Sequence, residues 1–181
     1  SAARAAALVE LARAHEAAGQ FDKAMGEARE ASETAEDAKA DGELVDALTV
    51  EGRVLVSDLR LDDAGPILDR AMAIARKLNE DRSELASGRV GTLTVELARL
   101  ALSRRAATPA MSLIDGLNLP QPGVGAPLAY RANAVRVKIG ALTAMSRFDE
   151  ALPIATKELG WAESRLASGH PSLLRARWPR R

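Results

Sequence analysis

The 181-residue sequence contains no cysteine and only two histidines, His15 and His170. The absence of cysteine excludes disulfide bonds and thiolate metal sites, and two histidines leave little for imidazole ligands or acid–base chemistry. No arrangement typical of a serine hydrolase or a zinc protease is recognisable. We expect His15 to be a core side chain, and we expect no enzyme activity, no metal and no cofactor.

Long apolar runs and an excess of one charge are missing as well. No stretch approaches the roughly 18 consecutive apolar residues of a membrane span. The 25 basic and 25 acidic side chains give a formal net charge of zero, whereas a general binder of nucleic acid or of a membrane surface needs an excess of lysine and arginine. We expect a soluble, cytoplasmic protein, and the arginine-rich usage is a weak hint of a bacterial source.

Helix-forming residues are abundant. Alanine, leucine, arginine and glutamate dominate, aromatic residues make up only 3% of the chain, and no alternating apolar and polar pattern persists beyond a few residues. The composition therefore predicts an all-α fold.

A short motif recurs along the chain, as GQFDKA at 19–24, LRLDDA at 59–64 and SRFDEA at 146–151, with a weaker copy, RAATPA, at 105–110. Each copy lies between two stretches with helical apolar periodicity, so the repeated unit is a helix, a short turn and a second helix. We expect a single domain, 1–181, of four such units, at about 4–39, 41–79, 83–117 and 126–168. A loop at 116–127 separates the third unit from the fourth, and a basic tail at 169–181 follows the fourth.

The first unit resembles the tetratricopeptide repeat family, because it carries the family's spaced bulky, small and turn residues: Leu8, Leu11, Ala12, His15, Gly19, Phe21, Ala24 and Ala31. The other copies match less fully, and Leu59 stands where the family has glycine. Equivalent alanines are 40, 46 and 41 residues apart, which is similar to the long repeats of kinesin light chains and of bacterial signal-transduction regulators. The alternative is four amphipathic hairpins without this geometry.

The resemblance implies a fold, an α-solenoid of four hairpins wound into a right-handed superhelix. Small residues such as Gly52 would let helices approach closely, and an aromatic residue that opens a second helix, Phe21 or Phe148, would wedge against the first. Asp41 and Thr108 are expected to cap helices. The tail either packs Leu173, Leu174 and Trp178 as a cap or marks the point where the sequence was cut.

The resemblance also implies a ligand groove on the concave surface formed by the first helices. Three successive units carry Arg13, Arg53 and Arg99 at one position of that groove. The fourth unit has Gly140 at this position, and Arg136 stands one turn before Gly140. Such a row suits carboxylates or phosphates, because guanidinium groups bind them in pairs of hydrogen bonds. The other expected groove residues are Val9, Thr49, Val50, Val95, Asn133 and Val137.

The alternative for this row is that Glu10 pairs with Arg13 and Glu96 with Arg99 in ordinary solvated ion pairs. Arg53 has no acidic residue three or four positions away, so we expect it to be the most available for a ligand. Reversing the charge of both Arg53 and Arg99 is then expected to weaken binding and to leave the melting temperature nearly unchanged.

The sequence thus favours a protein–protein interaction module that binds a peptide or partner segment, of acidic character, in its groove. A second hypothesis is an effector-sensing or oligomerisation domain of a larger bacterial transcriptional or signalling regulator. A third is a helical enzyme fragment. Fold resemblance alone cannot separate the three.

The zero net charge hides a division along the chain. Residues 1–84 contain 19 acidic and 11 basic side chains, and residues 85–181 contain 6 acidic and 14 basic ones. This polarity is compatible with a salt-sensitive homo-oligomer in which the acidic half of one molecule meets the basic half of another, or with an acidic partner on the second half.

Overall fold

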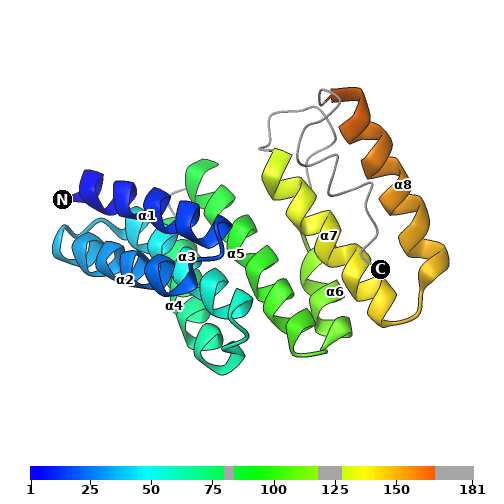
Figure 1. Cartoon of the computed structure of the whole chain (residues 1–181), viewed down its shortest axis with the longest axis horizontal. Helices are drawn as coiled ribbons and strands as arrows, with labels where there is room; N and C mark the ends of the chain where they lie inside the picture. Colours follow the sequence, from blue (N-terminus) through cyan, green and yellow to red (C-terminus); the bar gives the residue numbers. More distant parts are fainter. Residues whose placement is uncertain (80–83, 118–127, 166–181) are drawn as a thin grey trace.

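The structure, a computed structural model, describes residues 1–79, 84–117 and 128–165 (Figure 1). All regular structure in these ranges is α-helical, which confirms the expected fold class. The helices follow one another as α1 (Ala2–Ala17), α2 (Phe21–Asp37), α3 (Asp41–Ser57), α4 (Leu61–Asn79), α5 (Glu84–Ser103), α6 (Ala107–Asp115), α7 (Leu128–Ala144) and α8 (Phe148–Arg165).

Every helix packs against the next one in the chain, and the odd-numbered helices also pack in series, α1 on α3, α3 on α5 and α5 on α7. Within the described ranges, the even-numbered helices contact only their chain neighbours. The first helices of the four hairpins therefore form one continuous layer, and each second helix is attached to that layer separately.

The four aligned turn residues, together with Lys39 between α2 and α3, adopt the same left-handed conformation, with φ between 51° and 74°. At each turn two backbone bonds close the preceding helix: Gly19 N–H donates to Glu16 O, and Gln20 N–H donates to His15 O. The carbonyl of Gln20 then accepts the first bond of α2, from Ala24. Gln20 thus closes α1 with its N–H group and begins α2 with its carbonyl group. This double use of one residue explains how these helices are joined by only three residues.

The shortness of these turns also explains why the two expected helix caps are wrong. Asp41 and Thr108 are not caps: Asp41 is the first residue of α3, and Thr108 lies inside α6. The cap positions are Ala40 and Ala106, which provide no side-chain bond. Asp41 still places a negative charge in the first turn of α3, where the helix dipole favours it.

Small residues allow the close helix approach that the sequence predicts. Gly52 in α3 faces Leu68 in α4 so closely that a Cβ atom on Gly52 would lie 2.4 Å from Leu68 Cδ2. The repeated alanines of the second helices are all buried. The two phenylalanines behave differently, because Phe21 packs against the core whereas Phe148 is 59% exposed. The expected wedge at Phe148 is therefore wrong.

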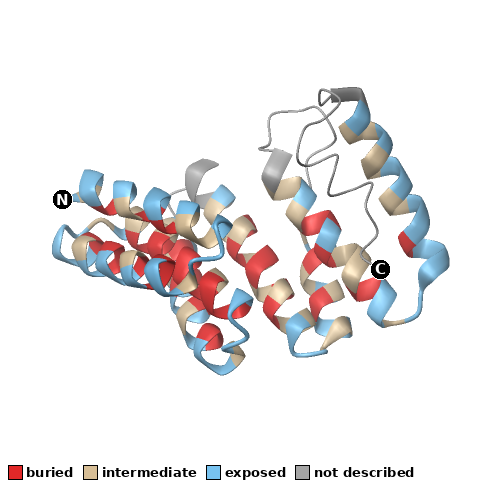
Figure 2. Ribbon diagram, in the orientation of Figure 1, coloured by how far each residue is buried: buried red, intermediate tan, exposed pale blue. Residues whose placement is uncertain are grey.

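The core is divided between the two ends of the array (Figure 2). One large cluster combines buried residues of α1–α4 with Leu93 and Leu100 of α5. A smaller cluster combines Val95 and Ala98, also from α5, with residues of α6 and α7. α5 therefore joins the two parts through different positions on its surface.

Two further expectations concern the segments between and after the hairpins. α6 ends early, at Asp115, as the proline- and glycine-rich loop predicts, but most of that loop and the whole expected capping tail, with Leu173, Leu174 and Trp178, lie outside the described residues. Among the helices that the structure describes, none has the length and apolarity that crossing a bilayer requires.

Candidate functional site

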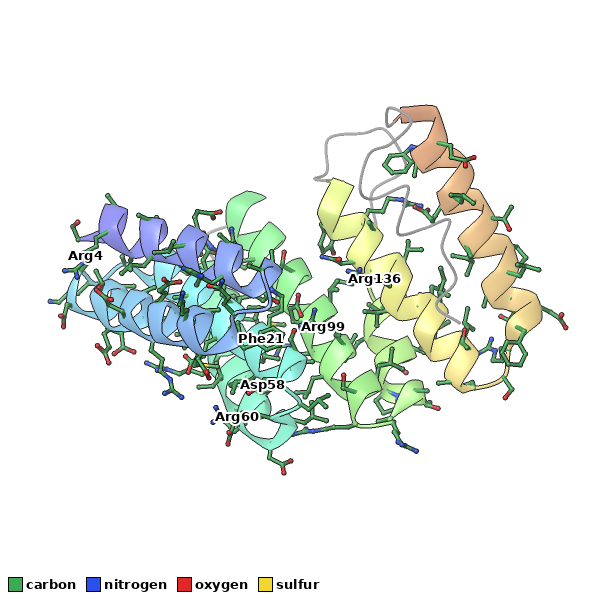
Figure 3. All side chains as sticks on the ribbon, viewed as in Figure 1. Arg4, Phe21, Asp58, Arg60, Arg99 and Arg136 are labelled. Atoms are coloured by element: carbon green, nitrogen blue, oxygen red, sulfur yellow. The ribbon has the colours of Figure 1, made fainter. Side chains whose placement is uncertain are left out.

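The candidate site is the charged row, defined as Arg13, Arg53, Arg99 and Arg136. The row crosses the layer of first helices, because its members lie on α1, α3, α5 and α7, and Figure 3 shows Arg99 and Arg136 on neighbouring helices. Packing of the odd helices in series brings the helices that carry these side chains next to one another.

Arg13 is the most exposed of the three aligned arginines and makes a local ion pair. Its Nη1 donates to Glu10 Oε1 at 2.5 Å, one turn earlier in α1. The side chains of Arg13 and Glu10 are 41% and 68% exposed, so solvent screens this pair and an external carboxylate can compete with Glu10.

Arg53 is not free, in contrast to the sequence expectation. Its Nε donates at 2.6 Å to Glu16 Oε2 of α1, and Nη2 pairs with the same oxygen. Both side chains are largely buried. Glu16 was missed by the sequence reasoning because it lies 37 residues away from Arg53, and only the alignment of α1 with α3 brings the two together.

Arg99 connects α5 to the last turn of α3. Its Nη2 donates to the carbonyl oxygen of Arg53 at 3.0 Å and approaches Ser57 Oγ at 3.4 Å. A cation at this place also interacts favourably with the negative end of the α3 dipole. A second contact between the same helices involves Arg89, which donates two bonds to the carboxylate of Asp46.

Glu96 lies beside Arg99, with Oε2 3.2 Å from Arg99 Nε, and is only 3% exposed. The two atoms are not aligned as a hydrogen bond, and Oε2 has no other hydrogen-bond partner among the described residues. The expected pair therefore forms, but it is buried rather than solvated.

The pKa of Glu96 is raised above its usual value, chiefly by burial. Arg99, Arg53 and Arg136 oppose that rise, and the carboxylate of Glu16 adds to it. The charged groups of four successive first helices are therefore coupled electrostatically at this carboxylate. Arg136 also donates to Asn133 Oδ1, one turn earlier in α7.

The apolar residues expected in the groove are placed in the core. Val9, Val50, Val95 and Val137 are no more than 5% exposed, and Thr49 is buried with its hydroxyl bonded to Val45 O. These positions face neighbouring helices, so the expectation that their side chains hold a ligand is wrong.

His15 lies near the end of α1 and contacts both the turn and α2 of the first hairpin. Its Nδ1 is 2.7 Å from Gln20 Oε1, and its Nε2 is 3.2 Å from Glu27 Oε1 of α2. It is partly rather than fully buried. Within the described ranges, no group of three or more histidine, aspartate or glutamate side chains could hold a metal ion.

A shallow pocket of about 280 Å³, which the sequence reasoning missed, lies between α4, α5 and α6. Leu97, Leu100 and Leu113 line its apolar part, and Asp69 and Arg104 supply charge. Arg104 is already bonded to Leu61 O at 2.7 Å.

Comparison of the chain with models of known protein families, and with curated protein sequences, found no match.

Proposed function

We propose that the chain is a tetratricopeptide-like helical solenoid that binds an acidic segment of a partner protein on its layer of first helices. The observation that carries this proposal is the packing of α1, α3, α5 and α7 in series, while within the described ranges the second helices contact only their chain neighbours. Such a layer presents one extended surface to a partner. The recurrence of one turn conformation at every described hairpin supports the same repeat.

The charged row supplies the chemistry of recognition. Arg13 is accessible and, among the residues that the structure describes, is held only by the exposed Glu10, so a carboxylate of the partner replaces a weak contact there. Arg53 and Arg99 are anchored to other parts of the fold and act mainly through their positive charge. We expect the partner to bind as an extended segment that crosses α1, α3 and α5.

Short acidic peptides and their lysine-containing counterparts test the proposal, with binding followed by fluorescence anisotropy. We expect the acidic peptides to bind and R13E to weaken that binding about tenfold, since a bidentate charge-assisted contact is lost. The matched control is R60E, because Arg60 makes a similar exposed pair with Asp63 outside the layer of first helices.

Two results would contradict the proposal. The first is absence of preference for acidic over basic peptides. The second is equal weakening by R13E and R60E, which would show a general charge effect without a defined surface.

A further inference from the structure

A buried carboxylate beside the charged row, that of Glu96, takes no part in the recognition proposed above. Glu96 is only 3% exposed, and its Oε2 lies 3.2 Å from Arg99 Nε. Neither of these two atoms has a hydrogen-bond partner among the residues that the structure describes. Their contact is therefore one of charge alone, at a place where burial makes a charge costly.

Arg99 connects this carboxylate to the rest of the row. Its Nη2 donates to the carbonyl oxygen of Arg53 on α3 at 3.0 Å, and the Arg53 guanidinium pairs with Glu16 on α1. Direct contacts therefore run from Glu96 on α5 through α3 to α1.

The charged groups that act on Glu96 come from four helices of the first layer. They are Arg99 on α5 itself, Arg53 on α3, Arg136 on α7 and Glu16 on α1, and Figure 3 shows Arg99 and Arg136 on neighbouring helices. α4 and α6 also pack on α5, but no charged group in their described residues acts on Glu96. The three arginines and two ionised glutamates have a net charge of +1, which becomes +2 when Glu96 is protonated.

Arg99 is the arginine that both Glu96 and an external anion can reach. Its side chain is 30% exposed, whereas that of Glu96 is buried, so a carboxylate of a partner reaches the guanidinium only from solvent. Two carboxylates beside one guanidinium repel each other, and salt screens a buried charge less than an exposed one. An ionised Glu96 therefore weakens the attraction of Arg99 for an anion of the partner.

We propose that Glu96 is a specificity-determining residue of the charged row, which competes with the carboxylates of the partner for Arg99 until it takes up a proton. Binding of the acidic segment and protonation of Glu96 then favour each other, because linkage between two sites is reciprocal. This inference rests on the proposed function, since it concerns the same site and the same partner.

The direction of the pH dependence follows from the charge on Glu96. Burial raises the pKa of Glu96 above its ordinary value of 4.5, so the proton is taken up at a higher pH than by an exposed glutamate. Below the raised pKa the carboxyl is neutral and does not compete. Affinity for the acidic segment is therefore expected to fall as the pH rises through that pKa.

The probe is a peptide whose acidic side chains are sulfonates, as in cysteic acid. Sulfonates stay ionised throughout the pH range of the test, so a change in affinity with pH comes from the protein. The peptide is tested with the parent chain, E96Q and the control E10Q. Glu10 lies three residues before Arg13, as Glu96 lies before Arg99, but its side chain is 68% exposed.

Fluorescence anisotropy measures the affinity between about pH 5 and about pH 8. We expect the affinity of the parent chain to fall about three- to tenfold as the pH rises, which corresponds to a change in the pKa of Glu96 of up to about one unit on binding. E96Q is neutral at every pH and should keep throughout the affinity that the parent has in acid. E10Q should keep the pH dependence of the parent, because its buried carboxyl is intact.

Calorimetric titration in two buffers of different ionisation enthalpy counts the protons taken up on binding. The parent and E10Q are expected to take up part of one proton per peptide, and E96Q clearly less. A purely structural contribution of Glu96 changes the affinity but does not remove proton uptake. Circular dichroism checks that each variant keeps its helicity.

The outcomes separate this inference from the proposed function. If acidic peptides bind but E96Q shows the pH dependence or the proton uptake of the parent, the inference is overturned and the proposed function stands. Loss of the pH dependence in E10Q as well as in E96Q overturns it too, because the effect would then not belong to the buried carboxyl. Failure of both the parent and E96Q to bind acidic peptides at any pH overturns the inference and the proposed function together.

Discussion

Leu59 holds a left-handed backbone conformation, with φ of 62°, at the turn between α3 and α4. A side chain with a Cβ atom pays about 1–2 kcal/mol there, and Leu59 recovers little by packing because it is 77% exposed. Glycine avoids that strain but loses about 0.5–1 kcal/mol through its more flexible unfolded chain. We therefore expect L59G to raise the free energy of unfolding by about 0.5–1 kcal/mol, measured by urea denaturation.

The control for this variant is L59A, which removes the same exposed side chain and keeps the Cβ atom. L59A should bring no comparable gain. If L59A and L59G stabilise equally, backbone strain at the turn is not the cause.

Glu96 gives the protein a pH dependence of known sign. Burial raises the pKa of Glu96 in the folded state above 4.5, so the folded protein holds this proton at pH values where the unfolded chain has released it. Stability contributed by this group therefore falls as pH rises from 4.5 through the raised pKa. E96Q stays neutral, and we expect it to be more stable than the parent at neutral pH, with a difference that shrinks toward pH 4.5.

Urea denaturation of both proteins between acid and neutral pH measures that difference. E10Q provides the matched control, because Glu10 occupies the equivalent repeat position in solvent. A difference between E96Q and the parent that stays constant with pH, or grows in acid, would show that burial does not dominate at Glu96.

The turn positions could be predicted from sequence because they depend on spacing within a repeat. The partner of Arg53 could not, since Glu16 comes next to it only through the relative register of α1 and α3. Burial of Val50 and Val95 was missed for a related reason. Which side of a first helix faces its neighbour depends on the packing of whole hairpins.

At the scale of the helices, ion pairs between first helices hold the layer together. Arg53 of α3 pairs with Glu16 of α1, and Arg99 of α5 bonds to the end of α3. Reversing both arginine charges is therefore expected to lower the melting temperature, in contrast to the expectation from sequence. Arg53 and Arg99 of the charged row thus contribute to the fold, whereas Arg13 makes only a local pair with Glu10, so substitution of Arg13 tests the proposed recognition with the least effect on stability.

A double-mutant cycle with R53M and E16Q measures the coupling between α1 and α3. We expect about 1–3 kcal/mol, because both groups are largely shielded from solvent and either one alone leaves a charge without its partner. The comparison cycle is R60M with D63N, an exposed pair within one turn, for which about 0.2–1 kcal/mol is expected. Equal coupling energies in the two cycles would contradict a role for the Arg53 pair in holding the layer.

The helices themselves could be predicted from sequence, since apolar periodicity and short turns are local properties. The first and last residues of the helices were predicted less well, because a residue such as Ala40 both closes one helix and begins the next without any capping side chain. Differences in exposure between residues at equivalent repeat positions could not be predicted from sequence either. Phe21 and Phe148 share one repeat position, yet Phe21 is partly buried against the core and Phe148 is exposed.

At the scale of the whole molecule, the divided core predicts unequal stability along the array. The large cluster covers α1–α4 and part of α5, the smaller one covers α5–α7, and α8 is largely exposed in Figure 2. In a repeat array each unit is stabilised mainly by its neighbours, so parts can open separately. We expect native-state hydrogen exchange to be slowest in α3 and α4 and clearly faster in α7 and α8.

Two core variants test whether the ends open separately. Leu48 of α3 and Leu142 of α7 are both fully buried, and truncation of either to alanine should cost about 2–5 kcal/mol locally. L142A should speed exchange in α7 and α8 and leave α2 and α3 nearly unchanged, because the first cluster contains no residue of α7. L48A should speed exchange in α1–α4 and destabilise α5 through Leu93 and Leu100, which belong to the same cluster. Uniform acceleration along the chain by L142A would instead show one cooperative unit, in which α5 transmits the loss from α7 to the larger cluster.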